Sequence, residues 1–317
     1  MDNAQSIVRR LNAFVLKLCH AGRVMADVSA TMQARYILST KHMFQRIFSA
    51  AALAAALSTG LLAPSLATAA GTGCPAHYAD GRAPEIRNPK LANATRELCY
   101  GVFGVMHSGI TRTPLWSAEN LRAENVAAAQ GMKRDNDFHA ESRLPRSQRA
   151  ELSDYARSGF DRGHLAPNGD MPDKRTQRES FTLANMVPQD GDHNRHIWAP
   201  IEGEVRKMAK KEGQLYVITG PAFLGNNLRK VGNVLVPSHM YKVVYSPRQK
   251  MAAAWFTENR AHADIQVIPV AELERIVGIE FLPSLSQQQK ERMLRLPNIK
   301  QKKQAKEPRD FWSGLKG

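Results

Sequence analysis

Three blocks of the chain decide the fold: Asp161-Arg162-Gly163-His164-Leu165-Ala166-Pro167-Asn168-Gly169-Asp170, then Asn185-Met186-Val187-Pro188-Gln189, then Asn194-Arg195-His196-Ile197-Trp198-Ala199-Pro200-Ile201-Glu202. They contain many of the side-chain types that can bind or hydrolyse a phosphodiester. A histidine can hold or take a proton near neutral pH, and an arginine fork matches phosphate oxygens. Amide and carboxylate oxygens are ligands that Mg²⁺ accepts. The blocks therefore predict a site that acts on phosphate esters.

The local pattern around these blocks predicts a strand, a turn and a helix. Residues 160–165 are expected to form a strand that ends at the site, and the Pro-Asn-Gly-Asp sequence after it is typical of a turn. A helix is expected to begin near Asn194 and to end at Gly213. Pro200 lies early in it, so a kink or a later start is also consistent with the sequence. Four apolar residues fall on one face of this helix, at positions 197, 201, 205 and 208.

Taken together, the blocks resemble the signature of the DNA/RNA non-specific endonuclease family, the sugar-non-specific branch of the ββα-metal nucleases. The resemblance extends more weakly from about Cys74 to Asn259. It implies an α+β fold, with a ββα-metal core and a mixed or antiparallel sheet flanked by helices. It also implies hydrolysis of DNA and RNA with Mg²⁺, or with Mn²⁺ as a substitute, to give 5′-phosphate products.

Three residues are expected to carry the chemistry. His164 is predicted to be the general base that deprotonates the attacking water, and Arg162 to neutralise charge on the phosphoryl group. Asn194 is predicted to be the direct Mg²⁺ ligand, because this ion keeps several waters and shares itself with substrate phosphate. The alternatives are a structural histidine, an Arg162–Asp161 salt bridge and a helix-capping asparagine.

Further residues complete the predicted site. Glu202 is expected to hold metal-bound water, with an ion pair to Arg206 as the alternative. Asn185 is grouped with the catalytic residues because it would orient the site or the substrate, while Arg134 and Arg195 are assigned to substrate binding. Two acids near Asn194, Asp190 and Asp192, are alternative metal ligands. Two histidines beside it, His193 and His196, are expected to be exposed and to take no part in the reaction.

The chain is strongly basic. Its formal net charge is +15 over 317 residues, and 43% of the residues are hydrophobic, which is enough for a sizeable core. A surplus of that size favours a polyanionic partner such as nucleic acid, an anionic membrane surface or an acidic polysaccharide. The alternative is a charge that serves only solubility.

The N-terminal region predicts export. Residues 1–42 form a basic extension or leader, which alone resembles a mitochondrial transit peptide. Residues 43–70 have the order of a secretory signal peptide: a short basic start, an apolar stretch and the small residues Ala67-Thr68-Ala69. An uncleaved anchor is the competing interpretation, but the stretch is shorter than the ~20 apolar residues of a spanning helix. We therefore expect a secreted or periplasmic protein without stable membrane association after cleavage, and a mitochondrial one as the minor alternative.

The cysteines agree with export. The chain has Cys19, Cys74 and Cys99, so removal of the leader and signal leaves an even number. A Cys74–Cys99 disulfide in an oxidising compartment is predicted, worth roughly 3 kcal/mol by loop entropy. Two buried free thiols are the alternative.

The rest of the chain predicts an endonuclease domain at residues 71–285 and a basic tail at 286–317 that is partly helical, solvated and disordered. Strands are expected at 98–107, 214–219, 234–237, 240–246 and 251–257, and helices at 118–130, 147–155 and 269–277.

Two other functions stay open at this stage. One is a non-catalytic protein that retains the nuclease fold and binds nucleic acid or another polyanion. The other is a phosphodiesterase that acts on a different class of diester.

Overall fold

A computed structural model describes residues 72–299 of the chain. The predicted leader (residues 1–42), the whole predicted signal peptide (residues 43–70) and the end of the basic tail (residues 300–317) lie outside these residues. No helix within the described part is long and apolar enough to cross a membrane.

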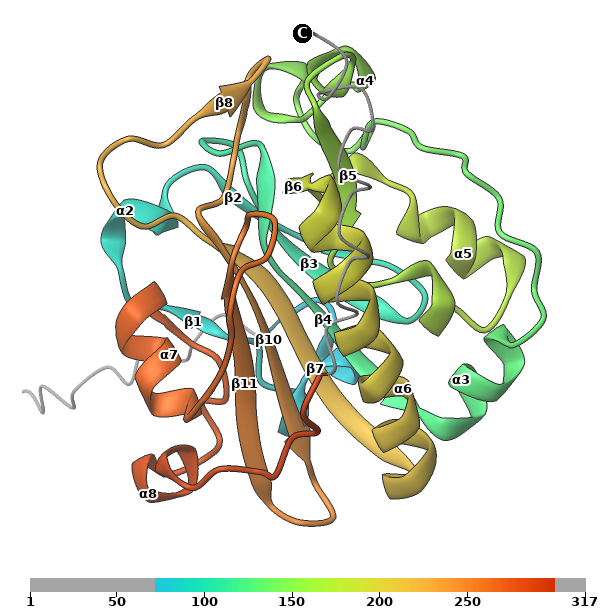
Figure 1. Cartoon of the computed structure of the whole chain (residues 1–317), viewed down its shortest axis with the longest axis vertical. Helices are drawn as coiled ribbons and strands as arrows, with labels where there is room; N and C mark the ends of the chain where they lie inside the picture. Colours follow the sequence, from blue (N-terminus) through green and yellow to red (C-terminus); the bar gives the residue numbers. More distant parts are fainter. Residues whose placement is uncertain (1–71, 300–317) are drawn as a thin grey trace, which may run out of the picture. The chain divides into compact units, whose positions relative to one another are not determined.

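The centre of the described region is a seven-stranded sheet in which every neighbouring pair is antiparallel (Figure 1). From one edge to the other the strands are β12 (Ile265–Ile268), β11 (Met251–Glu258), β10 (His239–Ser246), β7 (Gln214–Ala222), β4 (Thr113–Arg122), β3 (Phe103–Ser108) and β2 (Thr95–Cys99). The predicted α+β class with an antiparallel sheet is confirmed.

Alternation along the strands gives the sheet two faces, because successive side chains of a strand point to opposite sides. On β10, Tyr241 and Val243 join the apolar cluster that contains helix α7 (Val270–Val277). Val244 joins the cluster on the other side, which contains helix α6 (Ala199–Glu212). We call these the α7 face and the α6 face.

A smaller ββα unit carries the deciding blocks. Strands β5 (Phe160–His164) and β6 (Met186–Asp190) pair antiparallel, and a π-helical turn, η6 (His193–Trp198), leads directly into α6. Pro200 lies in the first turn of α6, directly after the π-helical turn η6, so the helical pattern changes at the proline as the sequence allowed. Gly213 ends the helix with φ 85°, a conformation that glycine adopts without strain. The predicted strand and helix are both confirmed.

Short elements connect these parts. They are η1 (Pro75–His77), η2 (Ala79–Gly81), β1 (Glu85–Ile86), α2 (Pro89–Ala92), α3 (Ala123–Ala129), η3 (Arg146–Gln148), α4 (Leu152–Tyr155), η4 (Asn168–Asp170), α5 (Lys174–Ser180), η5 (Leu183–Asn185), β8 (Lys230–Val231), β9 (Val234–Leu235), β13 (Ile279–Glu280) and α8 (Gln287–Glu291).

Three predicted elements differ from the structure. The single strand at 98–107 is two strands, β2 and β3, joined by a tight connection. The helix at 118–130 starts only at Ala123, because Trp116 and Ala118 pack in the core as part of strand β4 between β3 and β7. The helix at 147–155 is reduced to η3 and α4. In the predicted helix at 118–130, pairing with the neighbouring strands therefore overrides the helix preference of Ala, Glu and Leu.

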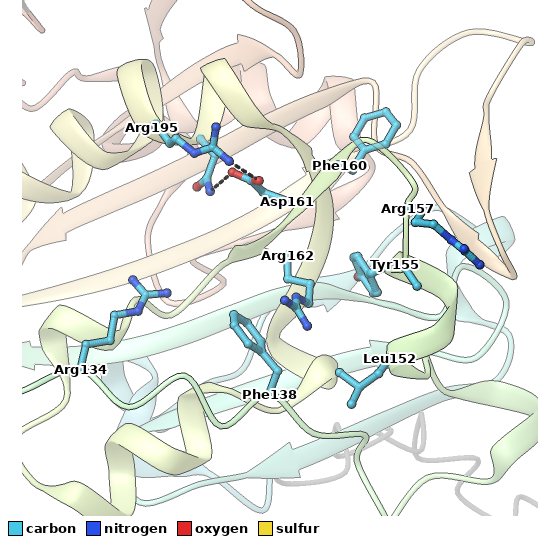
Figure 2. A pocket seen from close by; sticks show the side chains of 11 residues that line it. Arg134, Phe138, Leu152, Tyr155, Arg157, Phe160, Asp161, Arg162 and Arg195 are labelled. Carbon is cyan, nitrogen blue, oxygen red and sulfur yellow. Dashed lines mark hydrogen bonds and ion pairs between the residues drawn. The ribbon is translucent and has the colours of Figure 1, made fainter.

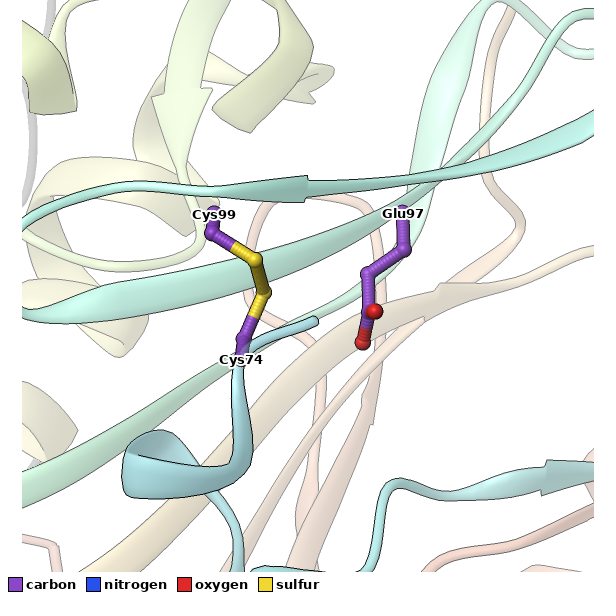
Figure 3. Close-up of side chains that lie close together, drawn as sticks. All are labelled: Cys74, Glu97 and Cys99. Atoms are coloured by element: carbon purple, nitrogen blue, oxygen red, sulfur yellow. A yellow bond between two sulfur atoms is a disulfide. The ribbon is translucent and has the colours of Figure 1, made fainter. Parts of the chain in front are cut away.

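The predicted disulfide is present between Cys74 and Cys99, whose Cα atoms lie 5.5 Å apart (Figure 3). The start of the predicted tail forms helix α8, which is mostly exposed as predicted, except for one buried lysine. Lys290 of α8 is buried, and its Nζ lies 2.7 Å from Glu280 and 3.2 Å from Glu274. The folded domain therefore continues past residue 285.

Candidate active site

Strand β5 presents Arg162 and His164 on one side and Asp161 on the other, because side chains alternate along a strand. Arg162 stacks over the ring of Phe138, with its Cζ 4.1 Å from the ring centroid. No carboxylate of residues 72–299 forms an ion pair with Arg162, so the alternative of an Arg162–Asp161 salt bridge does not hold. Its guanidinium is thus held by an aromatic ring and keeps its donors for an anion.

A cavity of about 570 Å³ opens beside this strand (Figure 2). Arg162, Asn194, Arg134 and Arg195 all line it, so β5, η6 and the loop after α3 meet at one site. Four predicted site residues, from three separate stretches of the sequence, are therefore brought together around one opening.

His164 does not line this cavity, but its ring packs beside Phe138, which does. Its ring packs edge-on against Phe181, with centroids 4.9 Å apart, and beside Phe138 at 5.8 Å. Burial, followed by the positive charges of Arg134 and Arg162, lowers the pKa of His164 to about 3. The imidazole is neutral at pH 7, and its buried Nε2 has no hydrogen-bond partner among the described residues. A neutral ring with a free nitrogen is the state that a general base requires.

Asn194 is oriented by Asp161. Its Nδ2 donates to Asp161 Oδ2 at 3.0 Å, and the other carboxylate oxygen accepts from Arg195 at 2.6 Å. Because the amide nitrogen is occupied, the carbonyl oxygen of Asn194 is the atom left to bind a cation. Arg195 lines the cavity yet is tied to Asp161, so it also fixes the carboxylate that orients Asn194.

Asn185 is fully engaged inside the protein. Its side chain is completely buried, accepts from Ser117 Oγ at 2.7 Å and from the Ala166 amide at 3.0 Å, and donates to the Ala166 and Ser180 carbonyls. Its oxygen and both of its donors are used inside the protein, which is consistent with the expected role of orienting the site. Asn185 is a positioning residue that holds the turn two residues after His164.

Behind the site lies a buried group of charges, which we call the charge cluster. It consists of three carboxylates and two cations: Glu119, Asp170, Glu202, Lys242 and Arg206. Arg206 donates to Asp170 at 3.0 Å, and Lys242 Nζ donates to Thr219 Oγ1 at 2.6 Å. Glu202 therefore interacts with several charges, and the alternative of a surface ion pair with Arg206 does not hold, since Arg206 bonds to Asp170 instead.

The charge cluster sets the protonation of Glu202. Burial raises its pKa to about 7, and the positive charges of Lys242 and Arg206 oppose that rise. Burial, with the nearby Asp170, raises the pKa of Glu119 well above its ordinary range. Burial also raises the pKa of Asp170 and lowers that of Lys242, so these groups of the charge cluster shift toward their neutral forms.

Sequence reasoning missed Lys242, Glu119 and Asp170. One signal was present, since Lys242 interrupts an otherwise apolar run from Met240 to Tyr245. A charged residue inside a core strand is rarely tolerated unless it is paired.

The neighbouring acids and histidines have structural partners. His193 is buried and shares a hydrogen bond with Gln189, while Asp190 accepts from the His193 amide. His193 is thus not the exposed spectator that was expected, whereas His196 is exposed near Asp192. Among residues 72–299 the one group of three His, Cys, Asp or Glu ligand atoms close enough to hold a metal is Cys74, Glu97 and Cys99, whose sulfurs form the disulfide.

The model of the DNA/RNA non-specific endonuclease family matches residues 83–288, which include β5, β6, η6 and α6. The chain belongs to this family. It is therefore a nuclease, a hydrolytic enzyme.

Known relatives agree. The nuclease is 35% identical over 195 residues to "Nuclease C1" of Cunninghamella echinulata var. echinulata, which covers 55% of this chain and 77% of the relative. It is also 30% identical to "Endonuclease G, mitochondrial" of Bos taurus over 251 residues, and this alignment covers 71% of this chain and 84% of the relative. Among solved structures, an EndoG/EndoGI complex matches with a TM-score of 0.57 and 29% identity, over 61% of this chain and 88% of that one.

Proposed function

We propose that this nuclease hydrolyses the phosphodiester bonds of DNA and RNA with Mg²⁺, with His164 as general base and Asn194 as metal ligand. The observation that carries the proposal is the convergence of Arg162 and Asn194 on one cavity, whose lining residue Phe138 packs beside the neutral, unpartnered imidazole of His164. Mn²⁺ is expected to substitute for Mg²⁺, because it accepts the same oxygen ligands.

The residues at the site fit a hydrated Mg²⁺. The oriented carbonyl oxygen of Asn194 supplies one direct ligand, and Glu202 would accept hydrogen bonds from the ion's waters. When bound, the ion would supply positive charge to the phosphoryl group and the leaving oxygen. Glu202 has to be ionised for its part, and Lys242 favours that form.

The protein's own groups would do the rest. Arg162, which lacks a carboxylate partner in the described part of the chain, would bind a phosphate oxygen and hold the scissile group above His164. His164 Nε2 would take the proton of the attacking water. The phosphate charge would also offset Arg134 and Arg162, so substrate binding would raise the pKa of His164 toward a more effective range for a base.

The nuclease is expected to cut without sequence preference if it binds nucleic acid mainly through the phosphates. Arg134 and Arg162 offer charge rather than a base-specific surface, and contacts to phosphates carry no sequence information. Cleavage is then expected to weaken steeply as salt rises, because each neutralised phosphate releases counterions.

The test uses purified nuclease with plasmid and total RNA, in Mg²⁺ or in EDTA. Cleavage is expected in Mg²⁺ only, and His164→Ala and Asn194→Ala are each expected to reduce it by about 100-fold or more. His196→Ala is the matched control, since His196 is two residues from Asn194, exposed, and paired only loosely with Asp192 at 3.8 Å. Retention of nucleic acid without cleavage would support the non-catalytic binder instead.

The compartment is part of the proposal. The Cys74–Cys99 disulfide supports an exported protein, because disulfides persist in oxidising compartments. The mitochondrial alternative draws support from the relatives whose names carry that word. N-terminal sequencing of the mature protein separates the two: a start between Ala67 and Gly73 supports export, and a start elsewhere contradicts it.

A further inference from the structure

The cavity beside β5 has two chemically different ends (Figure 2). One end holds Asp161, Asn194 and Arg195, the residues that would take metal and phosphate. The other end is formed by α4 and the start of β5, with Leu152, Tyr155 and Phe160. The proposed reaction uses the first end and leaves the second without a role.

Leu152 is unusual for its exposure. Its residue surface is 44% exposed, and among the described residues only Ile110 and Met293 are other large apolar side chains with such exposure. An exposed leucine on a soluble surface needs no explanation by itself. Here it lies at the wall of a cavity that already contains a phosphate-binding arginine, so an apolar part of the substrate can reach it.

Tyr155 supplies a second, independent observation. Its residue surface is only 6% exposed, it lines the cavity, and its hydroxyl has no hydrogen-bond partner in the described part of the chain. Burial raises the pKa of this hydroxyl, so it stays protonated and can donate. Buried polar atoms without a partner are rare, and they commonly mark a place where a ligand or water completes the bond.

Aromatic rings and arginines alternate along the same wall. Arg162 lies over Phe138 at 4.1 Å, and Arg229 lies over Phe160 at 5.2 Å from the ring centroid. Flat apolar surfaces beside positive charge are the features on which proteins stack nucleobases while they track the phosphate backbone. Arg157 adds a further positive group at this end.

We propose that the end of the cavity formed by Leu152, Tyr155 and Phe160 is a subsite for one unpaired nucleobase next to the scissile phosphate. The proposal rests on the proposed function, since it takes the phosphate position from Arg162 and Asn194. A base in a duplex is stacked and paired, so it must swing out to enter such a pocket. The subsite therefore favours single-stranded nucleic acid, and it tolerates any base because every base has a flat face.

The test compares cleavage at each position of a single-stranded oligonucleotide that carries one abasic site. In the unmodified nuclease, cleavage at the one phosphodiester next to the abasic site is expected to fall by about 5-fold or more, because that base no longer stacks. Leu152→Ala is expected to lower kcat/KM on intact single strands and to make cleavage much less sensitive to the abasic site. Tyr155→Phe keeps the shape and removes only the hydroxyl, so a smaller effect in the same direction is expected.

Met293→Ala is the matched control, since Met293 has almost the same exposure, 45%, and does not line the cavity. It should keep the full abasic effect. The subsite proposal would be overturned if the unmodified nuclease cleaved equally well next to the abasic site and elsewhere. It would also be overturned if Leu152→Ala left the effect of the abasic site unchanged. Failure of the proposed function looks different, because then intact oligonucleotides would not be cut in a metal-dependent way at all.

Discussion

The α7 face and the α6 face of the central sheet are built by alternate residues of the same strands, and both carry apolar clusters, yet they differ near the active site. On the α7 face, Trp116, Ile218 and Tyr241 pack in an apolar cluster with α7. On the α6 face at the same level, Ser117, Thr219 and Lys242 are direct cross-strand neighbours. Both faces close an apolar core, but the α6 face also carries this row of polar groups, which contacts residues next to the active site.

The polar row reaches the site by two routes. Ser117 donates to Asn185, which holds the backbone of Ala166. Lys242 contacts Thr219 and the carbonyl of Leu165, the residue next to His164. The difference between the faces shows that a stability function and a catalytic function can be separated by a one-residue step along a strand.

The largest expected effect is on the α7 face. Leu273 is fully buried against the sheet, and Leu273→Ala should reduce the free energy of unfolding by about 2–5 kcal/mol, since it removes buried methyl groups and leaves a cavity. Chemical denaturation measures this loss. The kcat of the folded fraction should stay unchanged, and a large fall in kcat would mean that the two faces are not separable.

On the α6 face, Glu202→Gln should separate activity from stability. The pKa of Glu202 is raised to about 7 from an ordinary 4.5, so folding favours the protonated carboxyl. The stability that this gives is present below pH 4.5 and is lost as the pH rises through 7. Glutamine does not ionise, so the free energy of unfolding of the variant should be higher by on the order of 1 kcal/mol at pH 8. This figure is smaller than the full pKa shift implies, because Glu202 is partly in contact with solvent.

The same variant should lose about 100-fold in activity, because a neutral amide cannot replace a carboxylate that holds metal-bound water. Thermal melting at pH 5 and pH 8 and initial cleavage rates measure the two effects. A variant that is less stable at pH 8, or that keeps full activity, would contradict the assignment of Glu202.

The smallest expected effect is a shift of the pH profile. The titratable groups that interact with Glu202 are Lys242 on β10, Arg206 on α6, Asp170 on η4, Glu119 on β4 and Arg134 in the loop after α3. If ionised Glu202 limits activity, the acid limb of kcat/KM lies near pH 7. Lys242→Met removes a cation and should move that limb up by about 1 pH unit, while Asp170→Asn removes an anion and should move it down.

Profiles of kcat/KM from pH 5 to 9 distinguish these cases, with near-UV circular dichroism to verify folding. Shifts of both variants in the same direction would show that packing, rather than charge, links the cluster to activity.

Local pattern was enough to predict the strand at β5, the helix that ends at Gly213, and the residues of the three blocks. These depend on alternation, on a 3.6-residue period and on a glycine that accepts positive φ, all of which are properties of neighbouring residues. The resemblance of the blocks to a nuclease signature likewise needed only their order and spacing, and the family match confirms it.

Tertiary structure decided the rest, because the deciding contacts join residues far apart in the chain. Trp116 and Ala118 lie in a strand rather than a helix, since β3 and β7 pair on either side of β4. Asp161 orients Asn194 from 33 positions away, and Lys242 meets Leu165 from 77 positions away. Burial of His164 and Glu202, which sets their pKa values, exists only once the sheet and α6 have packed together.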